Sequence, residues 1–61
     1  MLSGKELKIK RIALDIKANE LAEMLNISKT YISLMENNRR KIPLHIYERW
    51  IEILGLKNKI N

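Results

Sequence analysis

The chain contains no cysteine, so it can form neither a disulfide framework nor a thiolate metal site or nucleophile. Its one histidine, His45, is not enough for a zinc site or a catalytic triad. No pair of catalytic carboxylates and no glycine-rich phosphate loop can be identified. A chain of 61 residues also buries only about 60% of the surface of its unfolded state, which leaves no spare core for an enclosed active site. These absences predict a protein that is not an enzyme and uses no cofactor or metal.

The sequence also lacks a long apolar run. The longest one is too short to span a membrane, and the first residues, from Met1 to Glu6, lack the apolar stretch of a secretory signal. Strand-like alternation, internal repeats, linkers and low-complexity segments are absent as well. We therefore expect a single domain, residues 1–61, in a soluble, cytoplasmic protein that does not bind membranes.

Four helices are predicted from residues that start or stop helices. The start signals are a capping-box pattern, a serine N-cap and a proline suited to a first turn, at Ser3 with Glu6, at Ser28 and at Pro43. The predicted helices span residues 4–15, 17–25, 29–37 and 43–54, and residues 56–61 form either one more turn or a frayed end. In the first helix we expect Leu7 and either Ala13 or Leu14 to face the core.

The stretch from Ala18 to Met35 has the spacing of a helix-turn-helix, in which two short helices cross at a steep angle. Ala22, in the fifth place, is small enough to let the second helix approach. Asn26, in the ninth place, tolerates the left-handed backbone conformation that the turn requires. Apolar residues occupy the places that face the interior, namely Leu21, Leu25, Ile27, Ile32 and Met35. The motif predicts a protein that sets one helix against the edges of DNA bases.

The charge balance indicates a polyanionic partner. Twelve Lys and Arg residues against seven Asp and Glu residues give a net charge of +5, and the isoelectric point near 9.8 is typical of nucleic-acid-binding domains. Arg39, Arg40 and Lys41 follow the second helix of the motif, and Lys17 and Lys29 lie at or near the starts of its two helices. Such a run is by itself also typical of a solvated turn, but its place next to the motif favours DNA binding.

The sequence resembles the Cro/CI-type helix-turn-helix proteins, which include the lambda-like phage repressors and many small bacterial regulators. The resemblance extends over residues 7–54 and is densest over residues 20–22 and 27–37. It implies an all-α, lambda repressor-like fold, a compact bundle of four to five short helices. It also implies a transcription regulator that binds operator DNA as a dimer.

The chain departs from the family pattern at two places. Lys17 and Ala18 occupy positions where the family usually has Ser or Thr followed by Gln, so the usual Gln contact at the start of the second helix is absent. Asn26 and Asn38 occupy positions where the family usually has Gly, and asparagine tolerates the backbone conformation there. We expect these departures to remove one DNA contact and to leave the fold unchanged.

If Ile32 and Met35 face the core, the outward face of their helix is free to enter a major groove. The candidates for base contacts on that face are Lys29, Thr30, Ser33 and Leu34. Lys29 can donate to guanine, the two hydroxyls can donate or accept, and Leu34 either contacts a thymine methyl or is an ordinary surface leucine. The candidates for phosphate contacts are the N-cap serine and the polar and basic residues around the motif, Lys17, Asn19, Ser28, Tyr31, Asn37, Arg39, Arg40 and Lys41.

The resemblance further implies an ion pair between Arg11 of the first helix and Glu36 at the end of the third. A bidentate, partly buried pair would hold the third helix against the rest of the bundle. The alternative is two unrelated surface charges.

The helix predicted over residues 43–54 carries two apolar stripes. The first stripe, expected to face the core, consists of Leu44, Tyr47, Ile51 and Leu54. The second consists of Ile46, Trp50 and Ile53, and it either completes the core or forms a surface for a second copy of the chain or another protein. A homodimer would set two recognition helices about one turn of DNA apart on a near-palindromic site.

These patterns predict a sequence-specific, double-stranded DNA-binding transcription regulator, repressor-like and of the phage or bacterial type. The main alternative is a protein-interaction module that keeps the helix-turn-helix shape and binds a second regulatory protein, which the missing Gln and the apolar stripes favour. A membrane-surface segment fits less well, because the positive charges are spread over several helices instead of lining one face.

Overall fold

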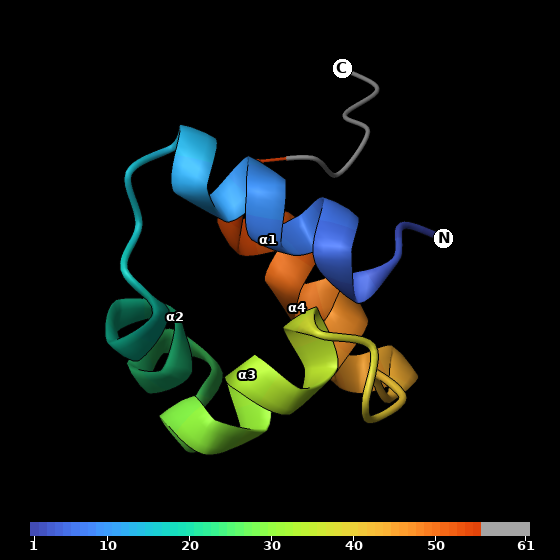
Figure 1. Cartoon of the computed structure of the whole chain (residues 1–61). Helices are drawn as coiled ribbons and strands as arrows, with labels where there is room; N and C mark the ends of the chain where they lie inside the picture. The colour runs from blue at the N-terminus through green and yellow to red at the C-terminus, as the bar shows by residue number, and fades with distance from the viewer. Residues whose placement is uncertain (56–61) are drawn as a thin grey trace.

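The computed structural model describes residues 1–55, so the extra turn or frayed end expected over residues 56–61 lies outside the described residues. Within that range the chain forms four helices and no strand (Figure 1), namely α1 (Gly4–Ala13), α2 (Ala18–Leu25), α3 (Lys29–Glu36) and α4 (Leu44–Ile53). The predicted all-α class is confirmed. None of the helices in the described part of the chain is long and apolar enough to cross a membrane.

The start of α1 follows the predicted capping box. Ser3 Oγ accepts a hydrogen bond from the Glu6 amide at 3.2 Å, and Glu6 Oε1 accepts one from the Ser3 amide at 2.8 Å. The helix ends at Ala13, earlier than predicted, because Asp15 adopts a left-handed conformation with φ of 62°. Leu7 is buried as expected, but Ala13 and Leu14 are exposed, so that part of the core prediction is wrong. Leu14 is the C-cap, where the chain already leaves the helix.

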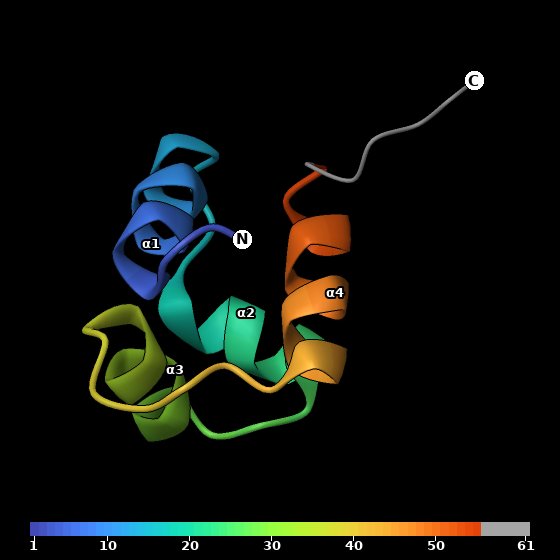
Figure 2. The ribbon, with the colours of Figure 1, turned by 90° about the vertical axis from the view of Figure 1, so that its right-hand side faces the viewer.

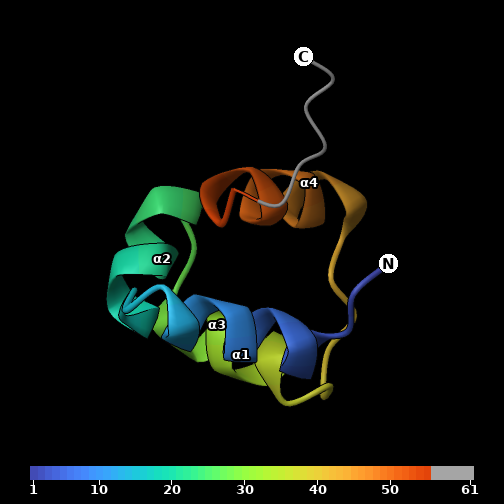
Figure 3. The same cartoon turned by 90° about the horizontal axis from the view of Figure 1, so that it is seen from above.

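All four helices contribute to one apolar core. Its fully buried side chains are Leu7, Leu21, Ile32, Met35 and Trp50. α1 lies beside α3 on one side of the molecule, α4 lies on the other side, and α2 packs against both α3 and α4 (Figure 2, Figure 3). Because every helix supplies at least one of these side chains, the core links all four.

The buried face of α4 differs from the prediction. It runs through Ile46, Trp50 and Leu54, which are 8%, 0% and 5% exposed. Ile46 and Trp50 come from the second predicted stripe and Leu54 comes from the first. Leu44, assigned to the core, is 61% exposed in the first turn of the helix. Ile46 and Trp50 complete the chain's own core, so the suggestion that they form a partner surface is wrong, and Ile53 is half-buried beside them.

A close approach of α1 to α3 requires glycine at position 4. A Cβ atom on Gly4 would collide with the main-chain carbonyl oxygen of Met35, and it would lie 2.8 Å from the carbonyl carbon. The Gly4 amide also donates to Asn38 Oδ1 at 3.2 Å, where the chain leaves α3. Asn38 has a φ of 61°, the left-handed conformation for which asparagine was expected to replace glycine. The side chain of Asn38 thus adds a hydrogen bond between α1 and the connection after α3, which a glycine would not supply.

Replacement of Gly4 by alanine is expected to lower the free energy of unfolding by about 1–3 kcal/mol, the usual cost of overpacking. Helix propensity alone favours alanine over glycine and predicts the opposite sign. Thermal unfolding followed by circular dichroism measures the difference. The control is Lys5→Ala at the exposed neighbouring position, and equal melting temperatures for the two variants would contradict the close approach.

Candidate nucleic-acid interface

The α2–turn–α3 segment has the geometry expected of a helix-turn-helix. The apolar positions of the motif point inward, with Leu21, Ala22, Leu25, Ile32 and Met35 buried and Ile27 half-buried. Asn26, the C-cap of α2, has φ and ψ of 59° and 43°, which is the left-handed conformation predicted for the turn. The Ile27 amide donates to the carbonyl of Ala22 at 2.9 Å, so the turn closes directly on the end of α2.

The opposite face of α3 points to solvent. Ile32 and Met35 are fully buried behind the helix. Among the predicted base contacts, Lys29, Thr30 and Ser33 are exposed and Leu34 is partly exposed. The four side chains therefore lie on the outward part of one short helix, which is the orientation that groove reading requires.

Ser33 is held by Asn37, the C-cap of α3, four residues further along the chain. The Asn37 side-chain Nδ2 donates to the Ser33 carbonyl at 2.9 Å and to Ser33 Oγ at 3.4 Å. The Ser33 hydroxyl thus accepts from Asn37, and its own hydrogen remains available for donation. Ser33 and Asn37 are both exposed, so this pair lies on the outward face of the helix.

The N-terminus of α3 is capped by Ser28, as predicted. Ser28 Oγ accepts a hydrogen bond from the Tyr31 amide at 3.0 Å. The first amides of a helix point along its axis and carry a partial positive charge. With the exposed Lys29 beside them, they make this end of α3 electropositive and suited to a phosphate group.

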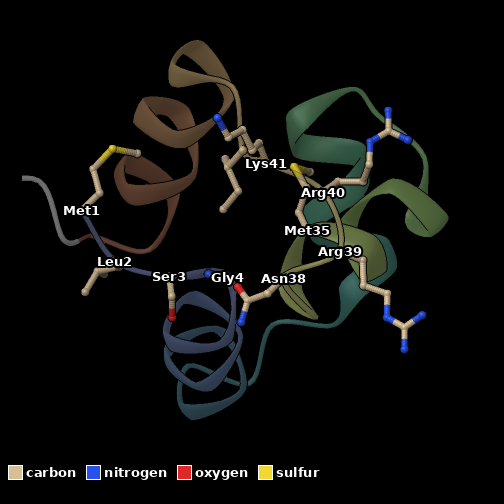
Figure 4. A pocket seen from close by; sticks show the side chains of 10 residues that line it. Met1, Leu2, Ser3, Gly4, Met35, Asn38, Arg39, Arg40 and Lys41 are labelled. Atoms are coloured by element: carbon tan, nitrogen blue, oxygen red, sulfur yellow. Dashed lines mark hydrogen bonds between the residues drawn. The ribbon is translucent and has the colours of Figure 1, made fainter.

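The connection between α3 and α4 carries the basic cluster Arg39, Arg40 and Lys41, and all three residues are exposed. The Arg39 and Arg40 side chains extend in different directions, away from a pocket between residues 1–4 and the connection (Figure 4). The Arg40 guanidinium carbon lies 5.7 Å from the centre of the Tyr31 ring. The fold thus brings Arg40, from the connection, back to a residue of α3.

The remaining predicted phosphate contacts, Lys17 and Asn19, are exposed at the start of α2. Glu20 Oε1 accepts a hydrogen bond from the Lys17 amide at 2.9 Å. The Lys17 side chain takes no part in the cap, because an ammonium group has no acceptor. These two residues, the N-cap and a first-turn residue of α2, are thus separate in the chain from the candidates on α3 and in the connection after it.

Arg11 and Glu36 form the predicted ion pair. Arg11 Nε lies 2.8 Å from Glu36 Oε2, and Nη2 donates to Oε1 at 3.1 Å. Arg11 Nη1 also donates to the carbonyl of Ile16 at 2.7 Å. Arg11 and Glu36 are only 7% and 3% exposed. The alternative of two unrelated surface charges is wrong, and the pair joins α1, the α1–α2 connection and the end of α3.

Two contacts in this region were not predicted. The bond from Asn37, the C-cap of α3, to Ser33 joins residues four apart. This spacing brings side chains together at a helix, so it could have indicated the contact in the sequence. The approach of Arg40 to Tyr31 spans the end of α3 and the turn after it, and no sequence period indicates it. Both contacts involve residues that were already candidates for DNA contact.

Comparison with known proteins gives one family. The model of the helix-turn-helix family matches residues 7–57, which is most of the chain and includes the whole α2–turn–α3 segment. The chain therefore belongs to the Cro/CI-type helix-turn-helix family. Members of this family are DNA-binding regulators and are not normally enzymes, so double-stranded DNA is the partner that the family implies. No curated protein and no solved structure matched the chain significantly.

Removal of one partner of the buried ion pair is expected to destabilise the fold. Glu36→Ala leaves the Arg11 guanidinium without its carboxylate, at a cost of about 3–5 kcal/mol. Urea unfolding at neutral pH measures this loss. The double variant Arg11→Met with Glu36→Leu provides the comparison, because it leaves no buried charge at either position. If Glu36→Ala unfolded at the wild-type urea concentration, the pair would have no structural role.

Proposed function

We propose that the chain is a repressor-like transcription regulator that binds a specific double-stranded DNA sequence, with α3 inserted in the major groove. The observation that carries this proposal is the orientation of α3. Ile32 and Met35 are fully buried, and the opposite face presents polar side chains to solvent. A protein of this type that regulates a bacterial or phage genome acts in the cytoplasm, where that DNA lies.

In this proposal the outward face of α3 reads the bases. Lys29 donates to O6 or N7 of a guanine, and Leu34 packs against the methyl group of a thymine. Thr30 and Ser33 supply hydroxyls, and the bond from Asn37 to Ser33 Oγ favours the donor role for Ser33. A base with an acceptor in the major groove is therefore expected opposite Ser33.

Contacts with the DNA backbone supply affinity and set the position of α3 in the groove. The residues proposed for this role are Lys17, Asn19, Ser28, Tyr31, Asn37, Arg39, Arg40 and Lys41. They are located at the start of α2, along α3 and in the connection after it, so they flank the base-reading face. The net charge of +5 supports a strongly salt-dependent interaction.

A homodimer is part of the proposal. One short recognition helix reads only a few base pairs, and a two-fold dimer doubles the contacted site and makes it near-palindromic. Ile46 and Trp50 are buried, so the dimer contact must lie elsewhere on the surface. Selection of bound sequences from a random duplex pool tests this point, since a single, non-repeated half-site in the selected DNA would contradict a dimer.

A protein-interaction module is the second candidate. It is favoured by Ala18, in the place of the usual Gln, and by Ile9 and Ile12 of α1, which are 60% and 56% exposed. Exposed isoleucines of this kind suit contact with another regulatory protein. Titration with random-sequence duplex DNA separates the two functions. A DNA-binding protein binds at low ionic strength and dissociates as salt rises, whereas a pure interaction module shows no such binding.

Lys29 and Arg39 are expected to affect DNA binding in different ways. Lys29→Ala should change which duplex sequences are preferred, because it removes a donor to the bases. Arg39→Ala should weaken binding to every sequence and reduce the slope of log K against log salt by about one. Fluorescence anisotropy with a panel of duplexes at several salt concentrations measures both effects. If both substitutions weakened all sequences equally, Lys29 would be a phosphate contact instead of a base contact.

A further inference from the structure

We propose that Tyr31 contributes to DNA binding through the face of its ring, which positions the Arg40 guanidinium for a phosphate. The proposal rests on the DNA-binding function proposed above and assigns a distinct role to one residue of that interface. The observation behind it is the 5.7 Å separation of Arg40 Cζ and the centre of the Tyr31 ring, which lies within the range of cation–π contacts.

Tyr31 provides a fixed platform. Its amide donates to Ser28 Oγ at 3.0 Å, in the first turn of α3, and its side chain is half-buried and packs against the apolar core. The ring therefore keeps its place relative to the recognition helix. A side chain that lies against the ring is positioned relative to the base-reading face as well.

Arg40 gains order from this platform. It is exposed and follows α3 in the connection to α4, where a long side chain samples many rotamers. The cost of ordering such a side chain on binding is reduced if it is already restrained. Arg39, its neighbour, extends in a different direction (Figure 4), so the chain direction alone does not determine where Arg40 points.

The chemistry of arginine suits this arrangement. A guanidinium group is flat, and its N–H donors lie in its plane. When the group lies over an aromatic ring, those donors remain available for a bidentate bond to a phosphate. A lysine has no such plane, so it can supply the charge but not the same pair of oriented donors.

The first test compares variants of Tyr31 in duplex binding. Tyr31→Leu removes the ring and is expected to weaken binding about two- to fivefold, which corresponds to an exposed cation–π contact. Tyr31→Phe keeps the ring and should bind more tightly than Tyr31→Leu. In an Arg40→Ala background, Tyr31→Leu should have no further effect. If Tyr31→Phe bound as weakly as Tyr31→Leu, or if the effect of Tyr31→Leu persisted without Arg40, the proposal would be overturned.

The second test changes Arg40, an exposed residue whose replacement leaves the core unaltered. Arg40→Lys preserves the net charge but removes the planar group, and we expect about two- to threefold weaker binding. Arg49→Lys on the exposed face of α4 is the matched control, with unchanged affinity. Wild-type affinity for Arg40→Lys would show that Arg40 acts only as a charge, contrary to the proposal.

A third measurement does not involve DNA. In the free protein, the Tyr31 ring should shift the proton resonances of the Arg40 side chain upfield, and Tyr31→Leu should abolish this shift while Tyr31→Phe retains it. If no ring-dependent shift is seen, the positioning contact is refuted, whatever the DNA affinity. If the shift is seen but wild-type protein fails to bind duplex DNA at low salt, the proposed function fails and the role of Tyr31 in it fails too.

Discussion

The bidentate contact of Arg11 with Glu36 joins three segments that are distant in the sequence. Arg11 lies in α1, Glu36 ends α3, and the third donor of the guanidinium reaches Ile16 in the α1–α2 connection. Because α3 has only eight residues, it is too short to be stable alone, and its position depends on packing. Ile32 and Met35 hold it against the core, and the ion pair holds its end against α1. The outward face of α3 is therefore defined by the contacts behind it.

The same part of the molecule depends on backbone conformations that few residues adopt. Asn26 in the turn and Asn38 after α3 both have left-handed φ values, 59° and 61°. Asparagine is one of the few residues other than glycine that tolerate this conformation. At position 38 the amide side chain also accepts a hydrogen bond from Gly4, beside the close approach of α1 to α3. Asn38, which replaces the family's usual glycine without a change of backbone conformation, thus also contributes to the contact between α1 and the end of α3.

The starts of the helices and the inward face of α3 could be predicted, whereas the buried face of α4 could not. A cap depends on residues within one turn, as at Ser3 and Ser28, so the sequence displays it directly. In α4 the apolar residues cover more than one face, so periodicity does not single out one direction. Packing against α2 selects a face that takes Ile46 and Trp50 from the second stripe and Leu54 from the first, and it leaves Leu44 exposed. The position of Arg40 beside Tyr31 was equally unpredictable, because it depends on the path of the connection after α3.

The sequence by itself determined the helix-turn-helix spacing, the residues that face outward on α3 and the presence of both partners of the buried ion pair. Each of these features follows from local periodicity, local capping chemistry or a family pattern, which the order of residues displays. Only the tertiary structure decided which face of α4 is buried, why position 4 must be glycine and which basic side chain lies over Tyr31. These features depend on the distance between segments far apart in the chain, and that distance is defined only once the core has packed.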